Sequence, residues 1–161
     1  AILKALIRIL SENKINVIKL NTFNPELTLR KGVYTKSKPT IDEKREIIKG
    51  IKILKKTNAH NHTQAVIIRN NKAVSFERRK GTKEMIKSIS RSKIKKGILI
   101  KLPKKKQDLR VDLPTIGLET FKDCYEAGIK GIVVKSNQNI ILNKNRSINY
   151  ANKNKIFLVA I

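Results

Sequence analysis

The spacing of apolar residues predicts a helix over residues 1–14 and a short strand over 15–20. The helix would carry its apolar side chains on one face, formed by Ile2, Leu6, Ile9 and Leu10. Residues 21–39 interrupt this pattern with Pro, Gly and polar side chains, which are typical of a connection. We therefore expect a domain boundary within 21–39. Because the chain opens with Ala1 inside a helical pattern, we also expect it to be a fragment that lacks its true N-terminus.

A second helix is expected to begin near Thr40 or Asp42, because either side chain can accept a hydrogen bond from the free N–H groups of a first turn. Its predicted apolar positions are Ile47, Ile48, Ile51 and Leu54. Two apolar runs then flank Asn70 and Asn71, whose tolerance of left-handed backbone favours a tight hairpin.

The rest of the chain continues this mixture of helices and strands. The further expected elements are a helix capped by Thr82, a strand over 97–102, a helix over 117–131 closed by Gly128 or Gly131, a hairpin around 136–139, a helix over 146–154 and a strand over 156–161. This order predicts an α/β (α+β mixed) fold, in which helices flank a mixed β-sheet with two hairpins. Residues 40–161 would form this domain.

The net charge raises the question of an anionic partner. The chain has 37 Lys and Arg against 12 Asp and Glu, which gives a formal charge of +25. Nucleic acid, an anionic membrane or a phosphorylated substrate would each explain it. Compositional drift is the other explanation, because Lys, Ile and Asn have A/T-rich codons and the cations are scattered. Arg is better suited than Lys to shaped phosphate recognition, yet Lys outnumbers Arg by 28 to 9. We therefore favour compositional drift as the cause of the charge.

Cysteine content and hydropathy narrow the possible class of protein. Cys124 is the single cysteine, so no intrachain disulfide can form, and the chain suits a reducing compartment. It belongs to the apolar face of the helix over 117–131, together with Leu118, Phe121, Tyr125 and Ile129, and is therefore expected in the core. No apolar run approaches the roughly 20 residues that a membrane span needs.

The stretch QDLRVDLPTIG, residues 107–117, is the most unusual local sequence, because it holds two of the chain's four Asp. If it is extended, Asp108, Arg110 and Asp112 face one way and form a salt-bridged strand edge. If it curls into a loop, the two carboxylates can converge on a divalent cation such as Mg²⁺, and Arg110 can grip a phosphate. The pattern alone leaves both arrangements open.

Two other stretches are candidates for a site. Gly81 and Thr82 stand at a helix start, where free N–H groups favour a phosphate, although an ordinary capped helix explains them equally well. Glu77 lies just upstream as an acid, a ligand or a surface charge. His60 and His62 could suggest a metal pair, but with no third His a closed zinc site is poorly supplied, and we expect an ordinary loop there.

Residues 64–86 and 101–136 resemble the C-terminal domain of the UDP-2,3-diacylglucosamine pyrophosphatases of the LpxI type. The matching features are Gln64-Ala65-Val66, Glu77, Gly81-Thr82, Met85-Ile86, Lys104, Gln107-Asp108, Arg110, Asp112, Pro114-Thr115-Ile116-Gly117, Ala127-Gly128 and Gly131-Ile132. The resemblance covers nearly the whole chain and implies that residues 1–20 are the remnant of an N-terminal domain, 21–39 a linker and 40–161 a C-terminal catalytic domain. This chain departs from the family pattern at Lys83, where an acidic residue is usual.

The resemblance implies Mg²⁺-dependent hydrolysis of UDP-2,3-diacylglucosamine to UMP and 2,3-diacylglucosamine 1-phosphate, a step of lipid A biosynthesis. It implies a cytoplasmic location, peripheral at the inner membrane with contact to anionic lipids, and no nucleic-acid partner. The implied catalytic residues are Asp108, Asp112 and Arg110, with both Asp as metal ligands; the implied substrate-binding residues are Gly81, Thr82, Lys104, Gln107, Thr115, Gln64 and Glu77. An isolated fragment is expected to be weakly active or inactive, and its oligomeric state is left open.

The alternative function is a basic nucleic-acid-binding domain without enzymatic activity. Aromatic residues, on which bases would stack, make up only 4% of the chain and cluster nowhere. Binding to a phosphate backbone also requires no pair of neighbouring Asp. The Asp motif therefore favours the hydrolase.

Overall fold

The computed structural model describes residues 2–61, 63–89, 96–105 and 107–161. Its main sheet has six strands in the order β1-β8-β6-β4-β2-β3. Their bounds are β1 Gly32–Val33, β2 Ala65–Arg69, β3 Lys72–Phe76, β4 Ile98–Lys101, β6 Gly131–Val134 and β8 Phe157–Ala160. Strands β4, β6 and β8 are parallel, whereas β1, β2 and β3 pair in antiparallel fashion. The predicted mixed sheet is thus confirmed.

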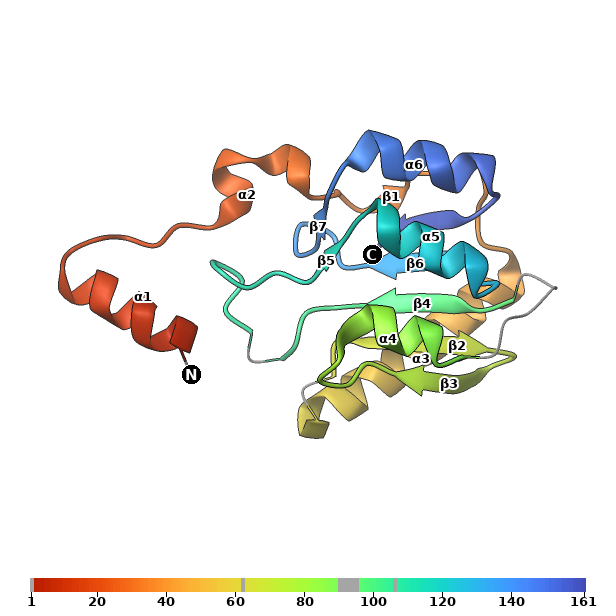
Figure 1. The fold of residues 1–161 in the computed structure, drawn as a ribbon, viewed down its shortest axis with the longest axis horizontal. Coiled ribbons are helices and arrows are strands. Elements are labelled where there is room, and N and C mark those ends of the chain that lie inside the picture. Colours follow the sequence, from red (N-terminus) through yellow and green to blue (C-terminus); the bar gives the residue numbers. More distant parts are fainter. Residues whose placement is uncertain (1, 62, 90–95, 106) are drawn as a thin grey trace.

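Helices cover both faces of this sheet (Figure 1). The long helix α3 (Ile41–Asn61) lies on one face. Three helices lie on the other face, namely α4 (Gly81–Lys87), α5 (Leu118–Glu126) and α6 (Lys144–Lys153). A second, small sheet pairs β5 (Thr115–Ile116) in parallel with β7 (Ile140–Ile141). The result is the predicted α/β fold.

Alternation along β4 decides which side chain meets which helix layer. Ile98 and Ile100 pack in the cluster under α3, whereas Leu99 packs in the cluster under α4 and α5. Because side chains alternate between faces, Lys101 continues the row of Leu99 and points toward α4. All four residues of β4 are buried, so this strand carries a buried lysine at its carboxyl end.

Local sequence signals placed several elements correctly. Thr40 Oγ1 accepts a hydrogen bond from the N–H of Glu43 (3.3 Å), and Glu43 accepts one from the N–H of Thr40 (2.7 Å), so Thr40 caps α3 as predicted. Asn70 and Asn71 have positive φ angles of 48° and 60° and form the predicted β2–β3 hairpin turn. Cys124 is fully buried, as expected.

Other predictions were wrong. Residues 15–20 form no strand, and the second predicted hairpin does not exist, because β6 belongs to the main sheet while β7 pairs with β5. Helix α4 is preceded by Lys80 as its N-cap residue, so Thr82 lies inside the helix and is not its cap. Ile48, predicted on the apolar face of α3, is 69% exposed.

The N-terminal residues extend away from the sheet (Figure 1). Helix α1 (Ile2–Glu12) forms as predicted but buries none of its residues. The short helix α2 (Leu20–Phe23) and the 3-10 turn η1 (Pro25–Leu27) follow it. From Thr28 onward the predicted linker joins the domain, because Leu29 is buried in the core and β1 pairs with β8. In the described part of the chain, no helix has the length and apolar character that crossing a membrane requires.

Candidate functional site

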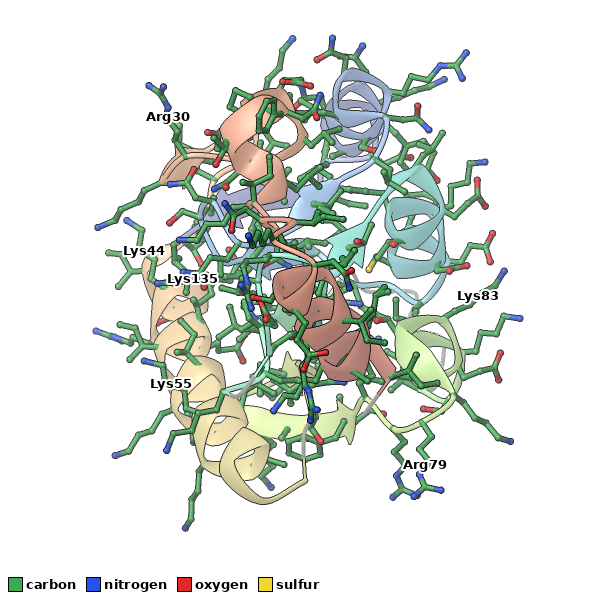
Figure 2. All side chains as sticks on the ribbon, turned by 90° about the vertical axis from the view of Figure 1, so that its left-hand side faces the viewer. Arg30, Lys44, Lys55, Arg79, Lys83 and Lys135 are labelled. Atoms are coloured by element: carbon green, nitrogen blue, oxygen red, sulfur yellow. The ribbon has the colours of Figure 1, made fainter. Side chains whose placement is uncertain are left out.

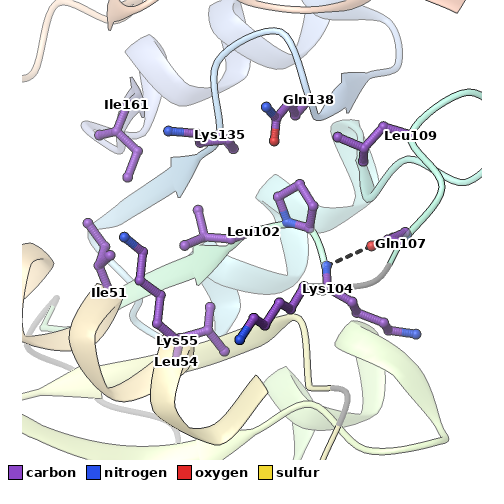
Figure 3. A pocket seen from close by; sticks show the side chains of 12 residues that line it. Ile51, Leu54, Lys55, Leu102, Lys104, Gln107, Leu109, Lys135, Gln138 and Ile161 are labelled. Carbon is purple, nitrogen blue, oxygen red and sulfur yellow. Dashed lines mark hydrogen bonds between the residues drawn. The ribbon is translucent and has the colours of Figure 1, made fainter. Parts of the chain in front are cut away.

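A cavity of about 560 Å³ opens where the carboxyl ends of β4, β6 and β8 meet (Figure 3). The segment after β4 forms one wall, α3 forms another, and Lys135 and Gln138 reach the cavity from the loop after β6. Its volume lies within the range of small-molecule sites. Ligands of α/β sheets gather at this edge, so the cavity is the natural centre of a candidate site.

The lining of this cavity combines apolar walls with cations. Its apolar side chains are Ile51, Leu54, Leu102, Pro103, Leu109 and Ile161, and its cations are Lys55, Lys104, Lys105 and Lys135. Gln107 and Gln138 complete the lining, and the side chain of Gln107 accepts a hydrogen bond from the backbone N–H of Lys104 (2.8 Å), which braces the loop. Such a lining suits a ligand that has both an apolar segment and an anionic group.

The Asp-rich stretch is curled and not extended. The backbone N–H groups of Val111 and Asp112 donate to the carbonyl oxygen of Asp108, at 3.2 Å and 2.9 Å, and so close a turn. Leu109 lines the lysine-rimmed cavity, whereas Asp108 and Arg110 line a separate hollow between this turn and α1. The structure therefore excludes the extended strand edge and places the two Asp on one turn.

Arg110 forms a bidentate ion pair with Asp108. Its Nε donates to Oδ1 at 3.0 Å, one terminal nitrogen donates to Oδ2 at 2.7 Å, and its backbone N–H also donates to Oδ1 at 3.1 Å. These hydrogen bonds, led by those from the Arg110 side chain, lower the pKa of Asp108 to about 2. Asp108 is therefore ionised at neutral pH. Asp112 receives no side-chain hydrogen bond from any described residue.

The two Asp match Mg²⁺ in donor type. Within the described ranges, no three His, Cys, Asp or Glu side chains form a group that could hold a metal ion. Mg²⁺ usually needs only one or two carboxylates, with water and substrate phosphates as its other ligands. Asp108 and Asp112 could supply that pair, provided that Arg110 releases one oxygen of Asp108.

A buried polar network lies on the other side of β4, under α4. Thr82 Oγ1 donates to Glu77 Oε1 at 2.6 Å and accepts from Lys101 Nζ at 2.6 Å. Lys101 Nζ lies 3.6 Å from Glu77 Oε1, and both side chains are only 7% exposed. Burial lowers the pKa of Lys101, and the charge of Glu77 opposes this effect. The network thus joins β4, α4 and the residue that directly follows β3.

These bonds occupy the groups expected to hold a phosphate. Thr82 has one hydroxyl hydrogen, and it is directed at Glu77. The N–H of Gly81 donates to the carbonyl oxygen of Arg78 at 2.9 Å. A phosphate held by the Gly81 N–H and the Thr82 hydroxyl would require both bonds to break.

The remaining predicted site residues are dispersed. Thr115 Oγ1 donates to the carbonyl oxygen of Leu113 at 3.1 Å and braces its own turn. Gln64 precedes β2 and, by alternation with Val66, lies on the α3 face. His60 lies in the last turn of α3 and not in the expected loop, and His62 lies outside the described residues.

Three residues at this edge of the sheet were not among the predicted site residues. Lys101 is the buried lysine of β4; Asn139 is 1% exposed; and Lys135 lines the cavity. The signal for Lys101 was available, because a lysine in step with Leu99 on a wholly apolar strand must face the core. Asn139 gave no such signal, since its stretch is typical of a turn.

The structure defines an α/β domain with a lysine-rimmed apolar cavity at the carboxyl ends of parallel strands. The chain belongs to the LpxI C-terminal domain family, whose model matches residues 30–159. It is 26% identical over 144 residues to the UDP-2,3-diacylglucosamine pyrophosphatase LpxI of Caulobacter vibrioides. That alignment covers 84% of this chain and 51% of the relative, so the chain spans about half the relative's length.

Proposed function

We propose that this chain is the C-terminal catalytic domain of a Mg²⁺-dependent hydrolase of lipid A biosynthesis. It would cleave the pyrophosphate bond of UDP-2,3-diacylglucosamine and yield UMP and 2,3-diacylglucosamine 1-phosphate. One observation carries the proposal: in a member of this family, a cavity with apolar walls and four lysines opens beside the Asp108–Asp112 turn. The substrate is likewise apolar at one end, where its acyl chains are, and anionic near the other, where its pyrophosphate is.

The cavity can contribute binding through both of its parts. The walls around Leu54 and Leu102 would contact acyl groups, because burying apolar surface contributes about 25 cal/mol per Å². Lys104 and Lys135 would attract the pyrophosphate to the same opening. Gln107 holds the loop of Lys104 in place, so its contribution is to orient that lysine.

The Asp108–Asp112 turn would supply the chemistry. Bound Mg²⁺ would neutralise charge on the pyrophosphate and make a coordinated water more acidic. Asp108 and Asp112 would hold the cation and orient a water toward one phosphorus, and the bridging oxygen would leave with the other phosphoryl group. Arg110, once it has released one oxygen of Asp108, would stabilise the charge on the leaving oxygen.

Changing each Asp to Ala tests this assignment in the full-length protein. We expect Asp108→Ala and Asp112→Ala each to lower kcat/KM for Mg²⁺-dependent UMP release about 100-fold or more, which corresponds to about 2.7 kcal/mol. Asp42→Ala is the matched control, because Asp42 is exposed on α3 and pairs only with neighbouring Arg45 (3.1 Å) among the described residues. Near-wild-type UMP release by both site variants would contradict the assignment.

A further inference from the structure

We infer that Lys101 is a positioning residue, which aligns the first turn of α4 with the loops at the carboxyl ends of β4 and β6. The side chain of Lys101 is 7% exposed and does not line the candidate cavity. It would act through Thr82 and Glu77 on one side and through Asn139 on the other. The link to turnover rests on the proposed function, whereas the alignment itself does not.

A row of residues across three strands brings Lys101 to Glu77. Lys101 pairs with Ala65 between β4 and β2. The N–H of Glu77 in turn donates to the carbonyl oxygen of Ala65 at 2.9 Å. Paired residues share a face of the sheet, so the three side chains stand in one row on the α4 side. The small side chain of Ala65 leaves the space above it in which Lys101 and Glu77 meet.

Thr82 connects this row to α4. Its hydroxyl accepts from Lys101 and donates to Glu77, so both of its hydrogen-bonding directions are fixed by buried charges. Thr82 is the second residue of α4 and follows the turn that carries Arg78, Arg79 and Lys80. The network therefore sets where this cationic turn lies relative to β4.

The backbone of Lys101 connects the row to the cavity. Its carbonyl oxygen accepts a hydrogen bond from Asn139 Nδ2 at 3.2 Å. Asn139 Oδ1 in turn accepts from the N–H of Lys135 at 2.9 Å, and Lys135 lines the cavity. Lys101 thus joins α4, through its side chain, to the loop after β6, through its backbone.

Stability alone explains this network poorly. Glu77 Oε2 is buried and has no hydrogen-bond partner among the described residues. Replacing a buried ion pair by apolar residues of similar size is often neutral or stabilising, so such a pair is weak evidence for stability. A pair that connects the turn before α4 to the strand at whose carboxyl end the cavity opens has a clearer use as a positioning device.

The kinetic test neutralises the whole pair in the full-length protein, with Lys101→Met and Glu77→Gln combined, so that no single buried charge is left to prevent folding. We expect kcat for UMP release to fall about 100-fold, as for a misplaced catalytic group, while KM changes less than about threefold. The matched control is Lys130→Met with Glu43→Gln, which removes an ion pair of 2.8 Å between α3 and the amino end of β6. A kcat near that of the wild type in the Lys101 double variant would overturn the inference.

A second measurement is independent of turnover. In Thr82→Val, which keeps the shape but removes the hydroxyl, we expect amide hydrogen exchange in α4 to be faster than in the wild type. Thr82→Ser restores the hydroxyl and should restore protection, whereas exchange in α5 should not change in either variant. If the wild-type protein releases no UMP, the proposed function fails, and the exchange rates still decide the alignment. Equal exchange in α4 of the wild type and Thr82→Val would overturn it.

Discussion

At the scale of single residues, the ion pair of Asp108 and Arg110 makes a prediction about pH. The pKa of Asp108 lies at about 2 because Arg110 donates to both of its carboxylate oxygens. The folded pKa is thus below the usual value of about 3.9. The stabilising contribution of the pair is complete above that usual value and is lost as the pH falls through about 2.

Arg110→Met should therefore raise the pKa of Asp108 toward its usual value of about 3.9, in an NMR titration of its carboxyl carbon. Arg45→Met removes one cation from the exposed surface of α3 and should leave the titration of Asp108 at its wild-type midpoint. An unchanged midpoint in Arg110→Met would show that the ion pair does not form in solution.

Residue-level predictions succeeded where the signal was local. Thr40 and Asn70 were predicted from their own conformational preferences, and both occupy the expected positions. Asp108 was placed in a motif, but its environment was not predictable, because the grip of Arg110 depends on how the turn closes. The burial of Lys101 follows from its step with Leu99, but its partners Glu77 and Thr82 do not, because they meet it only once β2 and β4 are paired.

At the scale of elements, the packing of β8 on β6 depends on a glycine in β6, Gly131. Gly131 pairs with Phe157, and a Cβ at position 131 would clash with the ring of Phe157. We expect Gly131→Ala to lower the free energy of unfolding by about 1–3 kcal/mol, measured by urea denaturation. Phe157→Leu should remove the clash, so Gly131→Ala should cost less stability in that background than in the wild type. If Gly131→Ala unfolds like the wild type, the ring does not lie over this glycine.

Elements were predicted well where periodicity and turn residues agreed. Helices α3, α5 and α6 and the β2–β3 hairpin follow from such agreement. The pairing of β7 with β5 was not predictable, because each strand has only two residues and their partners are distant in sequence. Residues 15–20 are apolar enough for a strand, but the described sheet offers them no neighbour.

At the scale of the molecule, the cations do not gather on one face. Figure 2 shows Arg30, Lys55, Arg79, Lys83 and other labelled cations extending from several elements around the domain. The labelled cations therefore come from several elements and not from one, which is what compositional drift predicts. An even distribution can still favour an anionic membrane, at about 1 kcal/mol for each cation near the surface.

We expect this chain to bind vesicles of phosphatidylglycerol and phosphatidylcholine in a salt-dependent way. Affinity in a sedimentation assay should fall steeply between about 0.01 M and about 0.1 M salt, because the screening length shrinks from about 30 Å to about 10 Å. Vesicles of phosphatidylcholine alone, which carry no net charge, are the control. Binding to anionic vesicles that is indifferent to salt would rule out the electrostatic contact.

The space above Ala65 has a consequence for how substitutions in this family are interpreted. Ala65 is fully buried, and by position it belongs to the core. A larger apolar residue there would fill the space in which Lys101 and Glu77 meet, even if the sheet accommodated it. Such a change looks conservative when only hydrophobicity is considered, yet it would separate two charges on neighbouring strands. Variation at position 65 therefore reports on the polar network and not only on core volume.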